Sequence, residues 1–240
     1  MAAGQANPEI VFVPGFMQSP DAWAAVAQRL PERYPSLCME HSEHTFEGRL
    51  AELATAADGA TLCGYSLGGR LALHAVLRDP QRYRALITVG SGAGIAEPTA
   101  RAARVEADER LAGWMETQPI EAIVAVWERQ PLFADQSEAL VERQRPGRLG
   151  QDPRELALLL RTAGQGALEP VWERLPEISI PTLALAGVLD ERYRGAAMRI
   201  ASSVPRGRHR AVEHAGHAPQ LQRPEEIAAR LVEFLDDHFG

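Results

Sequence analysis

Apolar and polar positions follow two alternating patterns along the chain. Short runs rich in β-branched and other apolar residues predict buried strands at 10–13, 61–63, 85–89, 182–186 and 208–212, with a weaker candidate at 37–39. Longer stretches in which apolar residues recur with helical spacing predict helices at 21–30, 47–57, 67–78, 193–203 and 225–237. Strand followed by helix, repeated in this way, is typical of a mostly parallel sheet covered by helices on both faces.

One long stretch interrupts this alternation. Between about residues 96 and 178 the chain shows helical patterns only. We expect breaks between these helices at Pro119, Pro131, Pro146-Gly147, Pro153 and Pro170. An all-helical insertion in an α/β chain is expected to lie over one edge of the sheet as a lid. The 240 residues are therefore interpreted as a single α/β domain with a helical lid insertion at about 96–178.

A serine stands where a predicted strand gives way to a predicted helix. Residues 64–68, Gly-Tyr-Ser-Leu-Gly, fit the pattern G-x-S-x-G. The sharp turn of this motif strains the serine backbone and requires small neighbours, and it lifts the hydroxyl to the mouth of a site. We therefore predict that the Ser66 hydroxyl is chemically reactive. The alternative interpretation is a glycine-rich turn in which the serine has no chemical role.

A serine hydroxyl becomes reactive when a histidine accepts its proton and an acid orients that histidine. In such a fold the acid follows a late strand and the histidine follows the last strand. Asp190 follows the strand at 182–186 and is our candidate acid, with Glu191 ranked second. His217 follows the last strand and is preferred over His214, because Gly216 lets the loop turn the imidazole toward the serine.

Two backbone amides are candidates to stabilise a developing oxyanion. Leu67 begins the helix after Ser66, where free N–H groups and the positive end of the helix dipole favour negative charge. The second donor is expected in the loop after the first strand. Gly15 permits a close backbone approach there, so the Phe16 N–H is the predicted donor.

Composition excludes several classes of function. The formal net charge of -7 argues against a nucleic-acid partner, and all 25 basic residues are arginine, which rules out a Schiff-base lysine and a lysine-bearing phosphate loop. His41 and His44 could be drawn with neighbouring glutamates as a metal cluster, but we interpret them as part of a polar loop. We expect no metal and no cofactor, since a serine–histidine–acid mechanism needs neither.

The chain shows no pattern that targets it to a membrane. The N-terminal segment lacks a charged stretch followed by a long apolar run, and no stretch approaches about 18 uninterrupted apolar residues. The two cysteines, Cys38 and Cys63, are interpreted as free thiols rather than a disulfide framework. We therefore expect a cytoplasmic protein without a membrane partner.

The motifs taken together resemble a known family. The segments VPGFMQSPDAW, GYSLGGRLALHAV, WERQPLF, GVLDERY and HAGHAPQ, in this order, are similar to the α/β-hydrolase superfamily. More narrowly, they resemble the 2-succinyl-6-hydroxy-2,4-cyclohexadiene-1-carboxylate synthases of menaquinone biosynthesis. That resemblance implies a carbon–carbon lyase that removes pyruvate from a succinyl-cyclohexene polycarboxylate. In it the activated serine abstracts a proton instead of accepting an acyl group.

A substrate with several carboxylates calls for arginines at the site. Arg70 lies four residues after Ser66, one helical turn along the same face, and its planar guanidinium suits a carboxylate. The resemblance further implies substrate contacts from Tyr65, Arg104 and Trp127, and from Arg192, which stands where the family often has lysine. The chain departs from the family at Pro14, where histidine is usual. We expect a small anionic carboxylate substrate.

Two other functions remain open at this point. A carboxylesterase or thioesterase would use the same three residues through an acyl-enzyme. The third possibility is a binding protein that has a hydrolase fold but no catalytic activity, although all three catalytic positions hold residues that can perform the chemistry.

Overall fold

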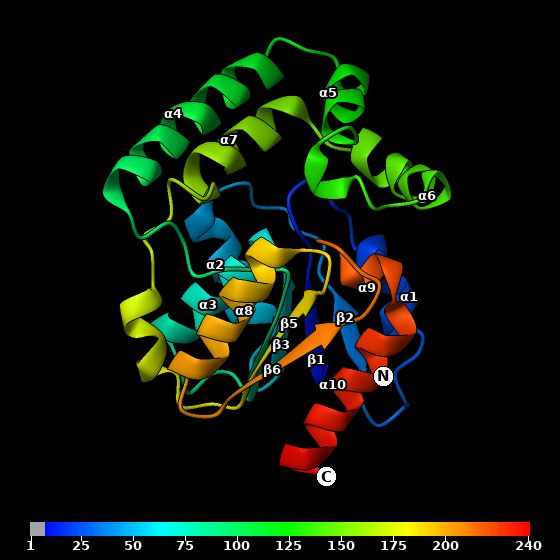
Figure 1. The fold of residues 1–240 in the computed structure, drawn as a ribbon, viewed down its shortest axis with the longest axis vertical. Helices are drawn as coiled ribbons and strands as arrows, with labels where there is room; N and C mark the ends of the chain where they lie inside the picture. The colour runs from blue at the N-terminus through cyan, green and yellow to red at the C-terminus, as the bar shows by residue number, and fades with distance from the viewer. Residues whose placement is uncertain (1–7) are drawn as a thin grey trace, which may run out of the picture.

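Six strands form the centre of the structure, a computed structural model that describes residues 8–240 (Figure 1). The strands are β1 (Ile10–Val13), β2 (Ser36–Cys38), β3 (Thr61–Tyr65), β4 (Ala85–Val89), β5 (Thr182–Gly187) and β6 (Gly207–Val212). They are ordered β2-β1-β3-β4-β5-β6, and every neighbouring pair is parallel. The parallel sheet predicted from the alternating pattern is thus confirmed, including the weaker strand candidate.

The four inner strands β1, β3, β4 and β5 contribute to two separate cores because successive side chains point to opposite faces of the sheet. In β1, Val11 and Val13 belong to one core, whereas Ile10 and Phe12 belong to the other. The first core is closed by α2 (Phe46–Ala56), α3 (Leu67–Arg78) and α8 (Glu191–Ser203). The second is closed by α1 (Asp21–Ala27), the short α9 (Pro219–Gln222) and α10 (Pro224–Phe239). Figure 1 shows these helices on the two sides of the sheet.

Most of the helical insertion lies beyond the carboxyl ends of the strands, at the top of Figure 1. This part comprises α4 (Pro98–Met115), α5 (Ile120–Trp127), η1 (Pro131–Phe133), α6 (Glu138–Leu149) and α7 (Pro153–Ala163). The last element, η2 (Trp172–Glu177), lies lower in the picture and packs against α3 and α8. A third core of buried side chains, among them Met115, Ile123 and Leu156, joins α4, α5 and α7. Met17 from the loop after β1 belongs to the same core, so the insertion is packed onto that loop.

The break predicted at Pro146-Gly147 is wrong. Pro146 lies inside α6, which continues to Leu149. Pro146 and Glu142, whose carbonyl loses its helical partner at this proline, are both exposed. Water can therefore satisfy that carbonyl, and the helix tolerates the missing N–H. Pro153 stands at the start of α7, as expected for a proline in a first helical turn.

Helix ends shift by a few residues from the predicted positions. The first helix ends at Ala27 rather than at residue 30, and α8 begins at Glu191, two residues early, because the Asp190 side chain caps it. No helix within residues 8–240 is long and apolar enough to cross a membrane. The expectation about the N-terminal segment falls partly on residues 1–7, outside the described part of the chain.

Candidate active site

Ser66 occupies the tight turn between β3 and α3. Its backbone has φ 50° and ψ −109°, a strained conformation for a residue with a side chain. A Cβ atom on Gly64 would lie 2.3 Å from the carbonyl oxygen of Gly68, so only glycine fits there. The Ser66 N–H donates to the carbonyl of Val89 at 2.9 Å, and the Ser91 hydroxyl donates to the Ser66 carbonyl at 2.8 Å. The strained turn is thereby tied to β4 and the loop after it.

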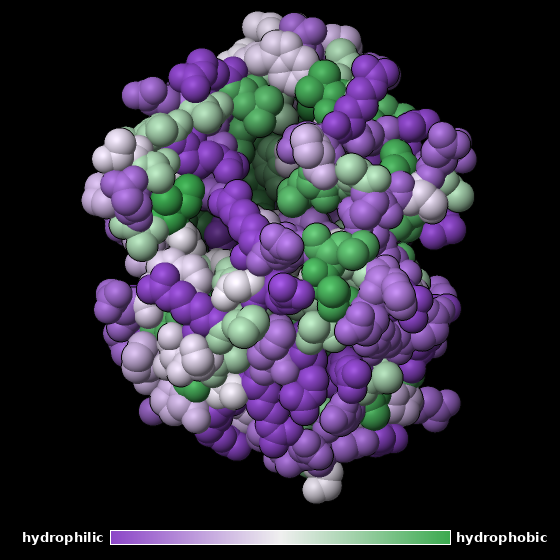
Figure 2. Space-filling model, viewed as in Figure 1, coloured by the Kyte–Doolittle hydropathy of each residue, from purple (hydrophilic) through white to green (hydrophobic). Residues whose placement is uncertain are grey.

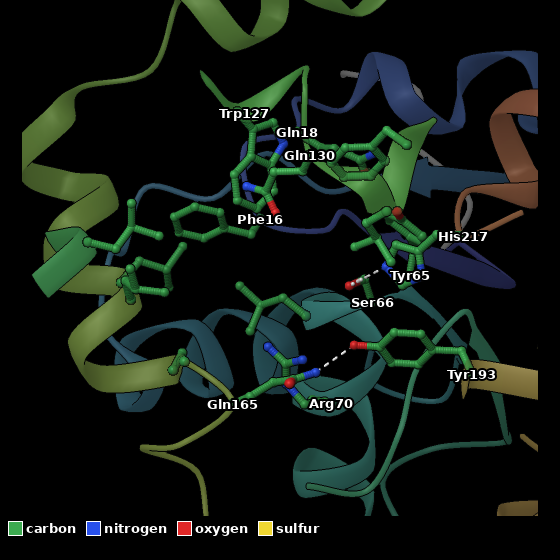
Figure 3. A pocket seen from close by; sticks show the side chains of 18 of the residues that line it. Phe16, Gln18, Tyr65, Ser66, Arg70, Trp127, Gln130, Gln165, Tyr193 and His217 are labelled. Atoms are coloured by element: carbon green, nitrogen blue, oxygen red, sulfur yellow. Dashed lines mark hydrogen bonds between the residues drawn. The ribbon is translucent and has the colours of Figure 1, made fainter. Parts of the chain in front are cut away.

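The structure brings Ser66, His217 and Asp190 into contact. The Nε2 atom of His217 lies 3.2 Å from Oγ of Ser66 (Figure 3). Its Nδ1 lies 2.7 Å from Oδ2 of Asp190. The His217 and Asp190 side chains are only 2% and 9% exposed. The second carboxylate oxygen of Asp190 accepts the N–H of Tyr193 at 3.2 Å, which fixes the carboxylate at the start of α8. The second-ranked residues, Glu191 and His214, are both exposed and outside this chain of hydrogen bonds.

Gly216 precedes His217 for a different physical reason from the one expected. A positive φ of 55° occurs at His214, not at Gly216. A Cβ atom on Gly216 would instead lie 1.9 Å from the carboxylate of Asp135, in the turn between η1 and α6. The Gln222 side chain donates to that carboxylate at 2.7 Å and accepts the Gly216 N–H at 2.9 Å. The glycine therefore allows the insertion to approach the loop that carries His217.

The amides of Phe16 and Leu67 are free to bind an anion. Both residues line the cavity that contains Ser66, and within residues 8–240 neither amide donates a hydrogen bond. The loop after β1 is held by the Gly15 N–H, which donates to the Gln18 side chain at 3.1 Å. A Cβ atom on Gly15 would lie 2.7 Å from the Tyr65 ring, so this glycine is needed for close approach. The geometry is compatible with the predicted pair of oxyanion donors.

A cavity of about 310 Å³ is lined by residues that follow the carboxyl ends of the strands and by residues of the insertion. Figure 2 shows a hollow among the helices of the insertion, with hydrophobic side chains in its depth. Nine of the ten residues singled out from the sequence line this cavity: Phe16, Tyr65, Ser66, Leu67, Arg70, Arg104, Trp127, Arg192 and His217. The tenth, Asp190, is not part of the wall and contacts Nδ1 of His217.

Arg70 is a buried cation without a partner. Its residue is 8% exposed, its Nε atom has no hydrogen-bond partner, and no carboxylate within residues 8–240 forms an ion pair with it. Burial lowers the pKa of the Arg70 guanidinium to about 10. Tyr193 and Asp108 oppose this effect on the pKa, whereas repulsion from Arg104 and Arg192 adds to it. A buried charge of this kind is costly unless a ligand supplies the missing anion.

Two further predicted arginines meet at one side chain. Nη1 of Arg104 donates to Oε1 of Gln165 at 2.9 Å, and Nη2 of Arg192 donates to the same oxygen at 3.3 Å. Arg104 also forms an ion pair with Asp108 at 2.7 Å. Gln165 lines the cavity and was not predicted. The segment Gly-Gln-Gly at 164–166 was the signal that could have indicated it.

Sequence reasoning also missed Arg148, Tyr193 and Phe133. Arg148 is 3% exposed, donates to Glu128 at 3.1 Å and to Gln144 at 2.8 Å, and lines the cavity. Burial lowers the pKa of its guanidinium, and the nearby Glu128 opposes that effect. The Tyr193 ring lies 4.5 Å from the His217 ring and confines it. These residues stand in or beside the insertion, where spacing along the chain does not indicate which side chains reach the serine.

The polar loop that contains His41 and His44 is occupied by hydrogen bonds of its own. Nδ1 of His41 lies 2.7 Å from the Glu52 carboxylate, which also accepts hydrogen bonds from Ser42 and Glu43. Burial lowers the pKa of His41 to about 4. Within residues 8–240 no group of three or more histidine, cysteine, aspartate or glutamate side chains is placed to hold a metal ion.

Comparisons with known proteins agree on the fold. A model of the Alpha/beta hydrolase family matches residues 10–230. A Bacillus subtilis (strain 168) protein provisionally named a 2-succinyl-6-hydroxy-2,4-cyclohexadiene-1-carboxylate synthase is 30% identical, over 96% of this chain and 91% of its own length. The synthase of that name from Serratia proteamaculans (strain 568) is 26% identical, over 97% and 95%.

A solved structure extends this similarity to three dimensions. The structure of MenH from S. aureus superimposes with a TM-score of 0.90 at 26% identity, covering 100% of this chain and 97% of that one. The fold predicted from the sequence, a parallel sheet with helices on both faces and the topology of the α/β-hydrolases, is therefore confirmed.

Proposed function

Because this chain belongs to the alpha/beta hydrolase family, we propose that it is a lyase that eliminates pyruvate from a succinyl-cyclohexene polycarboxylate in menaquinone biosynthesis. The observation that carries the proposal is Arg70, a buried and unpaired guanidinium in the same cavity as Ser66. An esterase for neutral substrates would have no use for a buried cation beside its serine. The names of the relatives that match over nearly the whole chain support the same reaction.

In this proposal the three contacting side chains generate a base. His217 takes the proton of the Ser66 hydroxyl, and Asp190 stabilises the resulting imidazolium through Nδ1. The Ser66 oxygen then removes a proton from a substrate carbon next to a carbonyl group. The electron pair from the broken C–H bond moves onto that carbonyl oxygen, where the amides of Phe16 and Leu67 can donate to it. When the pair returns, the bond to the departing pyruvate group breaks, its electron pair leaves with that group, and His217 gives its proton to it. Ser66, which carries the proton taken from the substrate, and neutral His217 are thereby restored.

The arginines of the cavity would hold the carboxylates of the substrate. Arg70 supplies a guanidinium that makes no ion pair within residues 8–240. Arg104, Arg192 and Arg148 contribute further guanidiniums to the same cavity.

Aromatic side chains form another part of the cavity wall. Trp127 lies beside Phe16, with ring centres 5.2 Å apart, and gives one wall an aromatic surface for a ring-shaped ligand. Tyr65 packs its ring 5.3 Å from that of His217. The substrate is thus a small polycarboxylate, with no cofactor required.

A carboxylesterase or thioesterase is the second candidate, favoured by the two free amides near Ser66. With the same three residues, Ser66 would attack the ester or thioester carbon and form an acyl-enzyme that water then hydrolyses. The two reactions differ in what the serine oxygen receives, a proton in the lyase and an acyl group in the esterase.

Parallel assays separate the two candidates. The purified protein should release pyruvate from the succinyl-cyclohexene precursor, measured through lactate dehydrogenase and NADH, far faster than it hydrolyses p-nitrophenyl esters or acyl-thioesters. Pyruvate release no faster than without protein would contradict the lyase proposal. Rapid ester or thioester hydrolysis in the same preparation would then favour the second candidate.

A further inference from the structure

Gln165 joins parts of the cavity wall that come from different layers of the molecule. Its side-chain oxygen accepts hydrogen bonds from Arg104 of α4 at 2.9 Å and Arg192 of α8 at 3.3 Å. Its amide nitrogen donates to the Tyr193 hydroxyl at 2.5 Å (Figure 3). A guanidinium has donors only, so the oxygen of the amide must face the two arginines. The neutral Gln165 side chain therefore accepts hydrogen bonds from two guanidinium groups at once.

The backbone around Gln165 is fixed against α4. A Cβ atom on Gly164 would lie 2.6 Å from the Asp108 carboxylate, and one on Gly166 would lie 2.6 Å from the Val105 nitrogen. The Arg101 side chain donates to the Gly166 carbonyl at 3.0 Å. These contacts leave the segment little freedom, and the Gln165 residue itself is only 8% exposed. The amide is held in place before any ligand arrives.

Positive charge in this cavity exceeds the negative charge paired with it. Of its four arginines, Arg104 is paired with Asp108 and Arg148 with Glu128. Arg70 and Arg192 form no ion pair in the part of the chain that the structure describes. A glutamate at position 165 would have the same length as the glutamine and would contact two of these guanidiniums. It would cancel much of the charge available to a ligand, because opposite charges at about 3 Å interact strongly in a partly buried site.

We propose that Gln165 is a positioning residue that sets the charge selectivity of the cavity. Its neutral oxygen holds Arg104 and Arg192 together without neutralising them, so that the cavity selects ligands with two or more carboxylates over those with one. The inference deepens the proposed function by assigning the residue that tunes its substrate class. Binding of carboxylates is nevertheless measurable without any elimination reaction.

The decisive variant is Gln165→Glu. It keeps an acceptor for both arginines, and the Tyr193 hydroxyl can turn its proton toward the new carboxylate. We expect the KM for the polycarboxylate substrate to rise by at least about tenfold, with kcat changed by less than about threefold. The melting temperature should stay equal or rise, since the new charge forms ion pairs. Gln165→Met, which removes the hydrogen bonds but adds no charge, should raise KM less.

Gln118→Glu is the matched control. Gln118 lies between α4 and α5, and among residues 8–240 its side chain donates only to the Thr117 hydroxyl. It does not line the cavity. This variant adds the same charge to the insertion and should leave KM within about twofold of the wild type. A tenfold rise in KM in this control as well would overturn the inference, because the effect would then come from net charge alone.

Calorimetric binding of citrate, succinate and acetate tests the inference apart from the reaction. The wild-type protein should bind citrate and succinate more tightly than acetate, and Gln165→Glu should weaken citrate binding at least about tenfold while changing acetate little. Equal citrate affinity in both proteins, or no preference over acetate in the wild type, would overturn the inference. If this charge dependence holds but no pyruvate is released, the proposed function alone fails. If pyruvate is released with an unchanged KM in Gln165→Glu, the inference alone fails.

Discussion

His217 lies 3.2 Å from the hydroxyl oxygen of Ser66, although 151 positions separate the two residues in the chain. The contact joins a loop after β6 to the turn after β3, two strands that are not neighbours in the sheet. Parallel strands end at the same edge of a sheet, so loops that follow different strands can converge there. The arrangement places an imidazole, a hydroxyl and the amides of Phe16 and Leu67 along a cavity that is also lined by arginines.

Arg70 is expected to lower the stability of the folded protein while strengthening its binding of the polycarboxylate substrate. Replacing Arg70 by Met removes a buried cation that has no partner, and the pKa of about 10 indicates that burial disfavours its charge. We expect the free energy of unfolding at pH 7 to rise by about 1–3 kcal/mol, measured by urea denaturation. The KM for the polycarboxylate should rise at least about tenfold. A variant that loses stability while keeping its KM would contradict the role assigned to this guanidinium.

Gly64 is expected to tolerate no side chain. In Gly64→Ala the added Cβ would lie 2.3 Å from the Gly68 carbonyl oxygen and 2.5 Å from the Gly69 nitrogen, both of which are backbone atoms that cannot move freely. The substitution should cost more than about 3 kcal/mol of unfolding free energy and abolish activity. Thermal unfolding followed by circular dichroism measures the loss.

Gly195→Ala is the control for this glycine. Gly195 lies inside α8, and a Cβ atom there would have nothing within 4 Å. Alanine is the better helix former, so this variant should gain about 0.5–1 kcal/mol. Similar losses in both variants would show that the effect does not come from crowding at the turn.

His41 makes stability depend on pH. Its pKa in the folded protein is about 4, below the ordinary 6.5. The unfolded chain therefore takes up the proton first as the pH falls, and stability present above pH 6.5 is lost between pH 6.5 and 4. The loss from this residue should be about 1–3 kcal/mol. In His41→Asn, urea denaturation at pH 7 and pH 4.5 should show a difference smaller by that amount. An unchanged difference would contradict the assignment.

The sequence predicted the site best at positions where the local backbone geometry itself requires a particular residue type. The glycines around Ser66 are needed by the turn itself, and the strand before it and the helix after it are visible as apolar patterns. Asp190 and His217 follow from the places where late strands end. These positions are set by the sheet, which short-range patterns describe well.

The wall formed by the insertion could not be predicted in the same way. Arg148 and Gln165 reach the cavity because α6 and the end of α7 fold back over the sheet, and helical spacing does not report that placement. Pro146 was expected to end a helix, but its exposed position allows α6 to continue. Local rules thus failed where tertiary packing decides the outcome.

Ser66 acts as the base for pyruvate release in the function proposed above. The most direct test compares the rate of pyruvate release by the wild type and by Ser66→Ala at saturating precursor, with circular dichroism to confirm that both proteins are folded. We expect kcat to fall by about 10³-fold or more in Ser66→Ala, with little change in KM. A folded Ser66→Ala protein that retains more than about a tenth of the wild-type rate would contradict it.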